Sequence, residues 1–292
     1  MDNTFRNTSL NLEFFAKEIR LSLLEQLYNR GFGHYGGSLS IVEVLAVVYG
    51  KWIRNTVGKP NINEDDWFIL SKGHGGPALY SVLALQGYIS KNSLLTLNDN
   101  GTMLPSHPDK NLTPGIQMTT GSLGQGVSVA VGLAKGIKGD GKDARVFTIV
   151  GDGELNEGQC WEAISFAAHH KLDNLIIFVD NNKRQLDGLT VDISNPFDFV
   201  EKMTAFGCDA QEVAGNDVNL IDAAIAKAYA TPGKPHIIIL DTIKGQGVSY
   251  LENLFDNHHL RPTQADEDAI KEAIAILRKQ TGKDEIGGCE HD

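Results

Sequence analysis

The sequence predicts an α/β protein with a doubly wound, mostly parallel sheet flanked by helices. Residues 145–150, 174–180 and 236–242 are continuous apolar runs, reading RVFTIV, NLIIFVD and HIIILDT. Continuous rather than alternating apolar strands are typical of parallel strands that helices cover on both faces. Segments with helical apolar spacing lie between these runs, and strands interleaved with helices indicate an open α/β sheet.

The remaining elements follow from local spacing and composition. A fourth strand is predicted at residues 65–71, and residues 98–117 are rich in turn formers and are predicted to form a long loop. We expect residues 1–262 to form one domain, and residues 263–292 to form a charged C-terminal helix and a tail. Helices are predicted within residues 11–31, 40–53, 76–88, 119–139 and 157–170.

The composition narrows the class of protein. The chain has 292 residues and a formal net charge of -11, which argues against nucleic acid and anionic membranes as main partners. Cys160, Cys208 and Cys289 are far apart and form no C-x-x-C pair, so neither a disulfide framework nor a zinc site is indicated. No apolar run is long enough to span a membrane, and the first residues lack a signal-peptide core. We therefore expect a cytoplasmic protein.

A glycine turn with carboxylates follows the first of the three apolar runs. Such a turn before a helix usually binds phosphate through backbone N–H groups, but here Asp152 and Glu154 stand beside Gly151 and Gly153. Asn182 follows the next apolar run, and parallel neighbours bring their carboxyl ends to the same edge of a sheet. Alone, the glycine turn is better interpreted as a tight turn with a solvated Asp152, and Asn182 as part of an ordinary turn after a strand. Together, Asp152 and Asn182 predict a divalent metal that binds a diphosphate.

Two other phosphate-binding motifs are excluded. The dinucleotide fingerprint G-x-G-x-x-G requires a third glycine, and Asn156 stands at that position. The P-loop pattern G-x-x-x-x-G-K-[ST] does not occur in the sequence. A metal-assisted diphosphate site is therefore the better interpretation of the glycine turn.

Three histidines, His34, His74 and His107, lie in segments rich in glycine or proline. A lone loop histidine is usually a solvated side chain, but three in similar settings favour a shared site. Imidazole exchanges protons near neutral pH, so these residues are candidates for acid–base catalysis.

One predicted helix carries a face of small residues, Gly126, Ala130 and Ala134, at intervals of four. Small side chains allow a neighbouring element to approach closely. Two interpretations stay open at this point, namely tight packing within the domain and an interface between subunits.

Several segments match a known family in the same order along the chain. GDGELNEGQCWEA followed by NLIIFVDNN is similar to the thiamine-diphosphate motif, in which GDG and NN flank a helix. The further matching segments are GHYGGSLSIVEVLAVVY, DWFILSKGHGGPALY, LPSHP, TTGSLGQG, HHKLDN and QLDG. With these segments the chain resembles transketolase over residues 12–260, specifically its N-terminal, diphosphate-binding half. The resemblance implies the thiamine-diphosphate-binding fold, thiamine diphosphate as cofactor, and Mg²⁺, Ca²⁺ or Mn²⁺ as the metal.

The resemblance also implies roles for the histidines. His34 and His107 would face the sugar oxygens and the reactive carbon, and His74 would lie by the diphosphate and the substrate channel. His258 fits a further active-site histidine of the family. His259 follows it where the family usually has glycine, which leaves open which of the two histidines acts.

Metal and cofactor contacts are implied in the same way. The metal would bind the side chains of Asp152 and Asn182 and the backbone oxygen of Arg184. Ser122 stands where many relatives have proline, and its alternative role is to cap the following helix. Glu157 matches an acidic position that links paired active sites, or is an ordinary first-turn glutamate. The expected cofactor contacts are His74, Gly121, Ser122, Leu123, Gly151, Asp152, Gly153, Glu154 and Asn182.

From this resemblance we expect the N-terminal subunit of a two-subunit transketolase. Such an enzyme moves a two-carbon ketol unit to an aldose from a ketose with a terminal phosphate or another anion. In the family a glutamate of a pyrimidine-binding domain activates the cofactor, and nothing in residues 262–292 resembles that domain. The expected partner is a C-terminal transketolase subunit, in a dimer of heterodimers. The alternatives are a deoxyxylulose-phosphate synthase, a 2-oxo acid dehydrogenase α subunit, or a non-catalytic regulatory paralogue.

Overall fold

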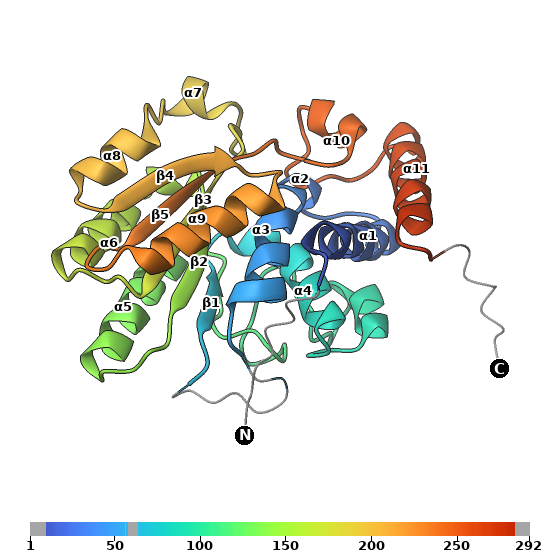
Figure 1. The fold of residues 1–292 in the computed structure, drawn as a ribbon. Helices are drawn as coiled ribbons and strands as arrows, with labels where there is room; N and C mark the ends of the chain where they lie inside the picture. Colours follow the sequence, from blue (N-terminus) through green and yellow to red (C-terminus); the bar gives the residue numbers. More distant parts are fainter. Residues whose placement is uncertain (1–9, 56, 58–63, 284–292) are drawn as a thin grey trace.

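The central sheet has five parallel strands in the order β1-β2-β3-β5-β4 within residues 10–55, 57 and 64–283, which the computed structural model describes (Figure 1). The strands are β1 Trp67–Leu70, β2 Val146–Gly151, β3 Leu175–Asn181, β4 Asp209–Ala214 and β5 His236–Asp241. Helices cover both faces, so the doubly wound parallel sheet expected from the sequence is confirmed.

β4 is the strand that the sequence pattern did not predict. It lies at the edge of the sheet and pairs only with β5 among the described strands. Its sequence, DAQEVA, is polar and only half-buried, because an edge strand is covered less completely than a central one. It therefore lacks the continuous apolar run by which the other four strands are predicted.

Helices occur in each of the segments where the sequence predicts them, but the helices at residues 35–39, 190–193, 199–205, 218–230 and 249–253 are not among those predicted. The predicted helix at residues 40–53 consists of α3 and a π-helical turn, η1. The helices are α1 Leu12–Arg30, α2 Tyr35–Leu39, α3 Val42–Val47, α4 Gly76–Leu85, α5 Gln125–Gly139, α6 Gly158–His169, α7 Thr190–Ile193, α8 Phe199–Ala205, α9 Val218–Ala230, α10 Ser249–Asn253 and α11 Gln264–Gln280. Shorter turns are η1 Val48–Trp52, η2 Gly73–Gly75, η3 Lys91–Thr96 and η4 Glu154–Asn156.

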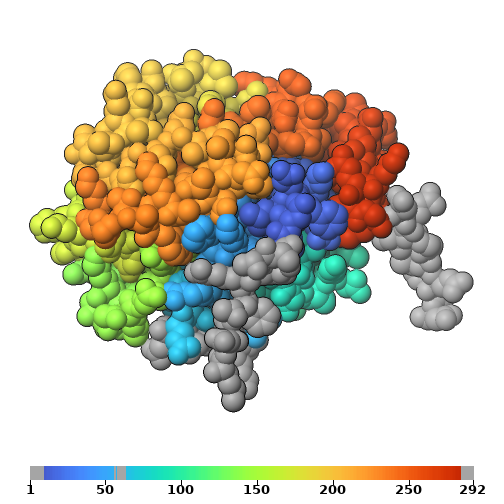
Figure 2. Space-filling model, in the orientation of Figure 1, coloured from blue at the N-terminus to red at the C-terminus, as the bar shows by residue number. Residues whose placement is uncertain are grey.

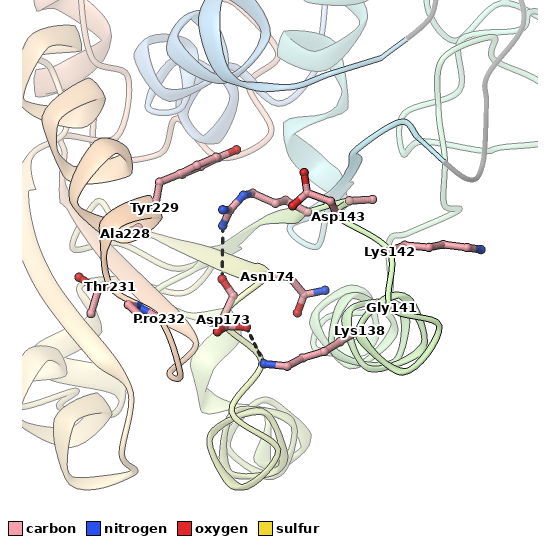
Figure 3. A pocket seen from close by; sticks show the side chains of 12 residues that line it. Lys138, Gly141, Lys142, Asp143, Asp173, Asn174, Ala228, Tyr229, Thr231 and Pro232 are labelled. Carbon is pink, nitrogen blue, oxygen red and sulfur yellow. Dashed lines mark hydrogen bonds and ion pairs between the residues drawn. The ribbon is translucent and has the colours of Figure 1, made fainter.

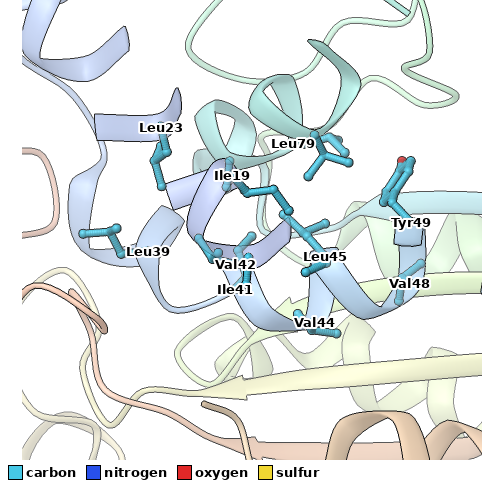
Figure 4. Close-up of a cluster of buried hydrophobic side chains, with 14 of the residues drawn as sticks. Ile19, Leu23, Leu39, Ile41, Val42, Val44, Leu45, Val48, Tyr49 and Leu79 are labelled. Atoms are coloured by element: carbon cyan, nitrogen blue, oxygen red, sulfur yellow. The ribbon is translucent and has the colours of Figure 1, made fainter. Parts of the chain in front are cut away.

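Two apolar clusters hold the layers together. On one face, α1, α3, α4, α9 and α11 pack with alternate strand residues such as Phe147 and Phe178. Figure 4 shows the part of this cluster in which Ile19 of α1, Leu45 of α3 and Leu79 of α4 converge. On the other face, α5, α6 and α8 cover the strands. In the space-filling view, the surfaces of α9 and α11 flank the N-terminal helices (Figure 2).

The small-residue face of α5 is explained by packing inside the domain. Gly126, Ala130 and Ala134 are all buried, and the two alanines belong to the apolar cluster beneath α5. A Cβ on Gly126 would lie 2.6 Å from the Cα of Ser71, so only glycine permits this approach to the end of β1. The alternative, a subunit interface built on these three residues, is therefore wrong.

The C-terminal helix α11 packs onto the same domain as the sheet. Thr263 and Asp266 form a capping box at the start of α11, whose Ile270 and Ile274 are buried against the N-terminal helices. The tail at 284–292, with Cys289, lies outside the described residues. No helix in the described part of the chain is long and apolar enough to cross a membrane.

Candidate active site

The carboxyl ends of β2 and β3 meet at one edge of the sheet. Gly151 pairs with Asp180 in the ladder, and the backbone N–H of Asp152 donates to the carbonyl oxygen of Asp180 at 3.1 Å. The turn after β3 brings the backbone N–H of Lys183 to Oδ2 of Asp152 at 2.7 Å. Asp152 and Asn182 therefore emerge together at this edge, as the sequence predicts.

A cavity of about 440 Å³ opens at this edge of the sheet. Ser122 is exposed and does not line it, and no side chain caps α5, so the alternative capping role of Ser122 is wrong. The N-cap of α5 is instead Gly124, with a φ of 79°. The other site residues expected from the sequence all line the cavity: His34, His74, His107, Gly121, Leu123, Gly151, Asp152, Gly153, Glu154, Asn182, Arg184 and His258.

Four histidines from four separate segments converge on this cavity. His34 precedes α2, His74 lies in η2, His107 belongs to the loop at 98–117, and His258 follows α10. The ring centroid of His34 lies 5.5 Å from those of His107 and His258. The centroid of His74 lies 5.0 Å from that of His258. The sequence predicts a shared site for the first three, and they do lie together.

Burial keeps these imidazoles neutral. Burial and the neighbouring His258 lower the pKa of His34 to about 3, and burial and Lys244 lower the pKa of His258 to about 4. The pKa of His74 is also lowered, by burial and by Lys72. A neutral imidazole has one donor and one acceptor nitrogen, so each ring can give or take a proton at a substrate oxygen.

The loops that carry His34, Lys244 and His258 are joined by the buried residue Asn257. Its side-chain Nδ2 donates to the carbonyl oxygen of Lys244 at 3.0 Å, and its backbone carbonyl oxygen accepts from the backbone N–H of Gly36 at 2.9 Å. A Cβ on Gly36 would come within 2.5 Å of Asn257, so the contact requires glycine. This junction fixes three cavity side chains that lie far apart in the sequence.

Of the two adjacent histidines, His258 is the one that lines the cavity. Its Nδ1 lies 3.1 Å from Nζ of Lys244. His259 is exposed, and its ring packs edge-on against that of His34 with centroids 4.7 Å apart. Partial burial and His259 lower the pKa of His107. The geometry favours His258 as the histidine that faces a substrate.

Asp152 and Asn182 suit a hard divalent cation. Their side chains are buried, and burial together with the nearby Asp180 raises the pKa of Asp152 to about 7. A cation would stabilise such a carboxylate, and carboxylate and amide oxygens are suitable ligands of Mg²⁺. No group of three or more His, Cys, Asp or Glu in the described chain could hold a metal alone. The remaining ligands would be the backbone oxygen of Arg184 and phosphate oxygens.

Glu154 joins elements of the protein beneath the cavity. Its Oε1 accepts hydrogen bonds from Oγ of Ser71 at 2.6 Å and from the backbone N–H of Gly124 at 2.8 Å. Its Oε2 accepts from the backbone N–H of Gly151 at 3.0 Å. Glu154 thus joins β1, α5 and β2, and because it also lines the cavity, its expected cofactor contact stays a prediction.

Two lysines of the cavity were not singled out by sequence reasoning. Lys72 is fully buried, and its Nζ lies 2.5 Å from the carboxylate of Asp180. Lys244 follows β5, and burial and the charge of Lys72 lower its pKa to about 8. A signal exists for Lys244, because it follows a buried strand within a glycine-rich segment, as Asp152 does. Lys72 stands two residues before His74 in the segment SKGHGGP.

A second cavity, of about 380 Å³, lies at the other end of the strands, next to the residues that precede β2 and β3 (Figure 3). Lys138 is ion-paired with Asp173 at 2.5 Å, and Lys142 pairs with Asp140. The guanidinium of Arg145 stacks on Tyr229. The principal charged groups of this second cavity therefore have partners within the protein. The cavity at the carboxyl ends of the strands is the stronger candidate for catalysis.

Comparisons with known proteins agree with this fold and site. A family model described as "Transketolase, thiamine diphosphate binding domain" matches residues 13–284. The solved transketolase from Campylobacter jejuni has a TM-score of 0.83 and 29% sequence identity, with 94% of this chain and 43% of that chain covered. The fold and the site define the thiamine-diphosphate-binding domain of an enzyme.

Two curated relatives match nearly their whole length. The 6-deoxy-6-sulfo-D-fructose transketolase subunit SqwG of Clostridium sp. (strain MSTE9) is 47% identical over 272 residues, covering 93% of this chain and 98% of that protein. An apulose-4-phosphate transketolase subunit of Actinobacillus succinogenes is 43% identical, covering 92% of this chain and 96% of that protein. The chain belongs to the transketolase family and is the N-terminal subunit of a split transketolase.

Proposed function

We propose that this subunit, with thiamine diphosphate, Mg²⁺ and a pyrimidine-binding partner, transfers a two-carbon ketol unit from a ketose to an aldose. The observation that carries the proposal is the convergence of Asp152, Asn182 and four histidines on one cavity at the carboxyl edge of the sheet. Thiamine diphosphate, when bound, supplies the electron sink for cleaving and forming the carbon–carbon bond.

The metal and diphosphate would bind at the ends of β2 and β3. We assign the metal to the side chains of Asp152 and Asn182 and to the backbone oxygen of Arg184, with Mg²⁺ as the natural ion and Ca²⁺ or Mn²⁺ as substitutes. Gly153 would present its backbone to the diphosphate. Lys244 lines the same cavity and would place an ammonium group near these phosphates. This arrangement orients the cofactor without a P-loop.

The histidines would move protons at the sugar. We assign His34 and His107 to the hydroxyl and carbonyl oxygens of the substrate, because their rings flank each other at the cavity. His258 would act beside them, and His74 would lie deeper, by the diphosphate. Their lowered pKa values leave the rings neutral near pH 7, which is the form that can accept a proton.

The substrate is proposed to be a ketose with a terminal anion. The relatives carry names with a sulfonated sugar in one case and a sugar phosphate in the other, so both anions are candidates. We place the enzyme in the cytoplasm as a dimer of heterodimers. The cysteines that the structure describes, Cys160 and Cys208, are free and buried, which suits a reducing compartment.

A donor assay tests the function directly. The enzyme, reconstituted from this chain and its C-terminal partner, is given a sulfonated or phosphorylated ketose and an aldose phosphate, and the shortened sugar is measured. Ketol transfer without decarboxylation of pyruvate supports the proposal. Pyruvate decarboxylation without ketol transfer would replace it with another thiamine-diphosphate activity.

A further inference from the structure

A fully buried carboxylate, Asp180, lies directly beneath the metal site. Its Oδ2 accepts hydrogen bonds from Oγ of Ser40 at 2.7 Å, Nζ of Lys72 at 2.5 Å and Nδ2 of Asn182 at 2.8 Å. Its Oδ1 accepts from Oγ1 of Thr242 at 2.5 Å. These donors come from four separate segments of the chain, and one of them is the side chain of a proposed metal ligand.

The charge of Asp180 is held in place by its surroundings. The Lys72 ammonium is ion-paired with this carboxylate at 2.5 Å, and the hydroxyl groups of Ser40 and Thr242 donate hydrogen bonds to its two oxygens. An ionised carboxylate can only accept hydrogen bonds. The group that Asn182 turns toward Asp180 must therefore be its NH₂.

The orientation of Asn182 follows from this constraint. With Nδ2 on Asp180, the amide oxygen faces the other way, where it accepts from the backbone N–H of Arg184 at 3.1 Å and keeps a further lone pair. A flipped amide would set its oxygen against the carboxylate of Asp180 and would turn NH₂, which cannot ligate a cation, toward the metal.

We propose that Asp180 is a positioning residue that holds the carboxamide oxygen of Asn182 toward the metal, with Lys72 as its counter-charge. The inference rests on the proposed metal site at Asp152 and Asn182. Outer partners that orient a metal ligand typically change metal affinity by about 10–100-fold when they are removed. Lys72 also contributes to stability, because without it Asp180 would be an unpaired buried charge near Asp152.

An exchange of the two side chains tests the orientation. Asn182→Asp provides a stronger metal ligand, but its carboxylate has no NH₂ for Asp180 and faces a like charge, so we expect Mn²⁺ affinity to fall at least about tenfold. In the pair Asp180→Asn with Asn182→Asp, the donor and acceptor are exchanged, and the amide at 180 can again orient the oxygen at 182. We expect this pair to bind Mn²⁺ more tightly than Asn182→Asp alone.

A second pair separates positioning from stability. Lys72→Met with Asp180→Leu replaces the buried ion pair by apolar side chains and leaves no acceptor for Asn182, and such a replacement often leaves stability unchanged because no charge is left alone. We expect melting close to wild type but Mn²⁺ affinity lower by about 10–100-fold. Arg54→Met with Asp66→Asn is the matched control, because Asp66 is also fully buried in an ion pair but lies at the start of β1. That pair should keep wild-type affinity.

The measurement is a titration of Mn²⁺, followed by its electron paramagnetic resonance signal, into the assembled enzyme at saturating thiamine diphosphate. Absence of binding in the wild type, or undiminished binding in Asp152→Ala, would reject the proposed metal site itself. If those two behave as proposed, wild-type affinity in Lys72→Met/Asp180→Leu would reject the positioning role. So would an exchange pair no tighter than Asn182→Asp alone.

Discussion

The backbone N–H of Lys183 donates a hydrogen bond to Oδ2 of Asp152 at 2.7 Å and so ties the turn after β3 to the turn after β2. The backbone N–H of Gly153 donates to the other oxygen, Oδ1, at 2.8 Å. The two turns that the sequence separates by a whole helix thus hold one carboxylate from both sides. Each carboxylate oxygen keeps a further lone pair with which it can bind a cation.

Asp152→Ala should abolish Mg²⁺-dependent binding of thiamine diphosphate while the fold persists. The substitution removes a charged ligand that no neighbouring carboxylate replaces, because Asp180 is engaged by Lys72. Calorimetry on the assembled enzyme measures the cofactor affinity. Asp187→Ala is the control, because Asp187 is exposed at the same cavity and should leave affinity unchanged. Wild-type cofactor affinity in Asp152→Ala would contradict the metal assignment.

His107→Ala should lower kcat by roughly 10²–10⁴-fold if His107 is a general acid–base group. Cofactor binding should survive, because the ring lies on the loop at 98–117 rather than at the strand ends. Steady-state kinetics with a ketose donor, together with cofactor calorimetry, measure both properties. His169→Ala, at the exposed end of α6, is the control. Unchanged turnover would return His107 to an ordinary loop histidine.

Lys244→Met should weaken thiamine diphosphate binding by about 10–100-fold, which corresponds to the loss of one hydrogen bond to a charged group, about 1.5–3 kcal/mol. The ammonium lines the cavity and lies beside His258. Lys244→Arg should recover part of the affinity, because it restores the charge. Lys138→Met, at the opposite edge of the sheet, serves as the control. Equal affinity of Lys244→Met and wild type would remove Lys244 from the diphosphate site.

Thermal stability of the free chain should fall as the pH drops below about 6.5, the ordinary pKa of histidine. His34 and His258 have folded pKa values of about 3 and about 4, so between these values and 6.5 the unfolded state binds more protons than the folded state. Stability must then rise with pH across this window and is fully present above it. Melting curves from pH 8 to pH 4.5 measure the effect. His34→Asn and His258→Asn should each flatten the profile, and steep profiles in both would refute this origin.

Much of the sheet and of its functional edge could be predicted from the sequence. Buried parallel strands read as continuous apolar runs, so their ends, and the positions of Asp152 and Asn182 beside one another, follow from pattern and topology. β4 was not predicted, because an edge strand need not be apolar and its sequence has no continuous apolar run. The pattern also could not choose between the two interpretations of the small face at Gly126, since spacing does not say which neighbour packs there.

The supporting network could not be predicted in the same way. Lys72 and Asp180 are 108 residues apart in sequence, and a lysine in a polar segment gives no sign that it will be fully buried. Asn257 likewise looks like a loop residue until the folded chain brings three segments around it. Local pattern predicts the elements and their ends, whereas the pairing of buried polar groups depends on the tertiary fold.

Large apolar side chains are exposed on the surface beside the cavity. Leu186 and Phe255 are 68% and 67% exposed and line a groove beside the proposed cofactor site. Large exposed apolar side chains at a cavity mark an interaction site. This chain covers 98% of a relative named as a transketolase subunit but only 43% of a solved transketolase chain, so we expect another polypeptide to cover the cavity.

The purified 292-residue chain should therefore turn over no ketose by itself, even with excess Mg²⁺ and thiamine diphosphate, and a C-terminal transketolase subunit should restore activity. The reason is that this chain is proposed to contribute only the residues that bind the metal and the diphosphate and those that transfer protons. The residues that bind the pyrimidine ring of the cofactor are expected on a second subunit. Two-fold symmetry is common in such assemblies, so mass measurement should give a dimer of heterodimers. Asp152→Ala chain with the partner is the control, which should assemble but stay inactive. Full activity of the chain alone would show that the site is complete without a partner.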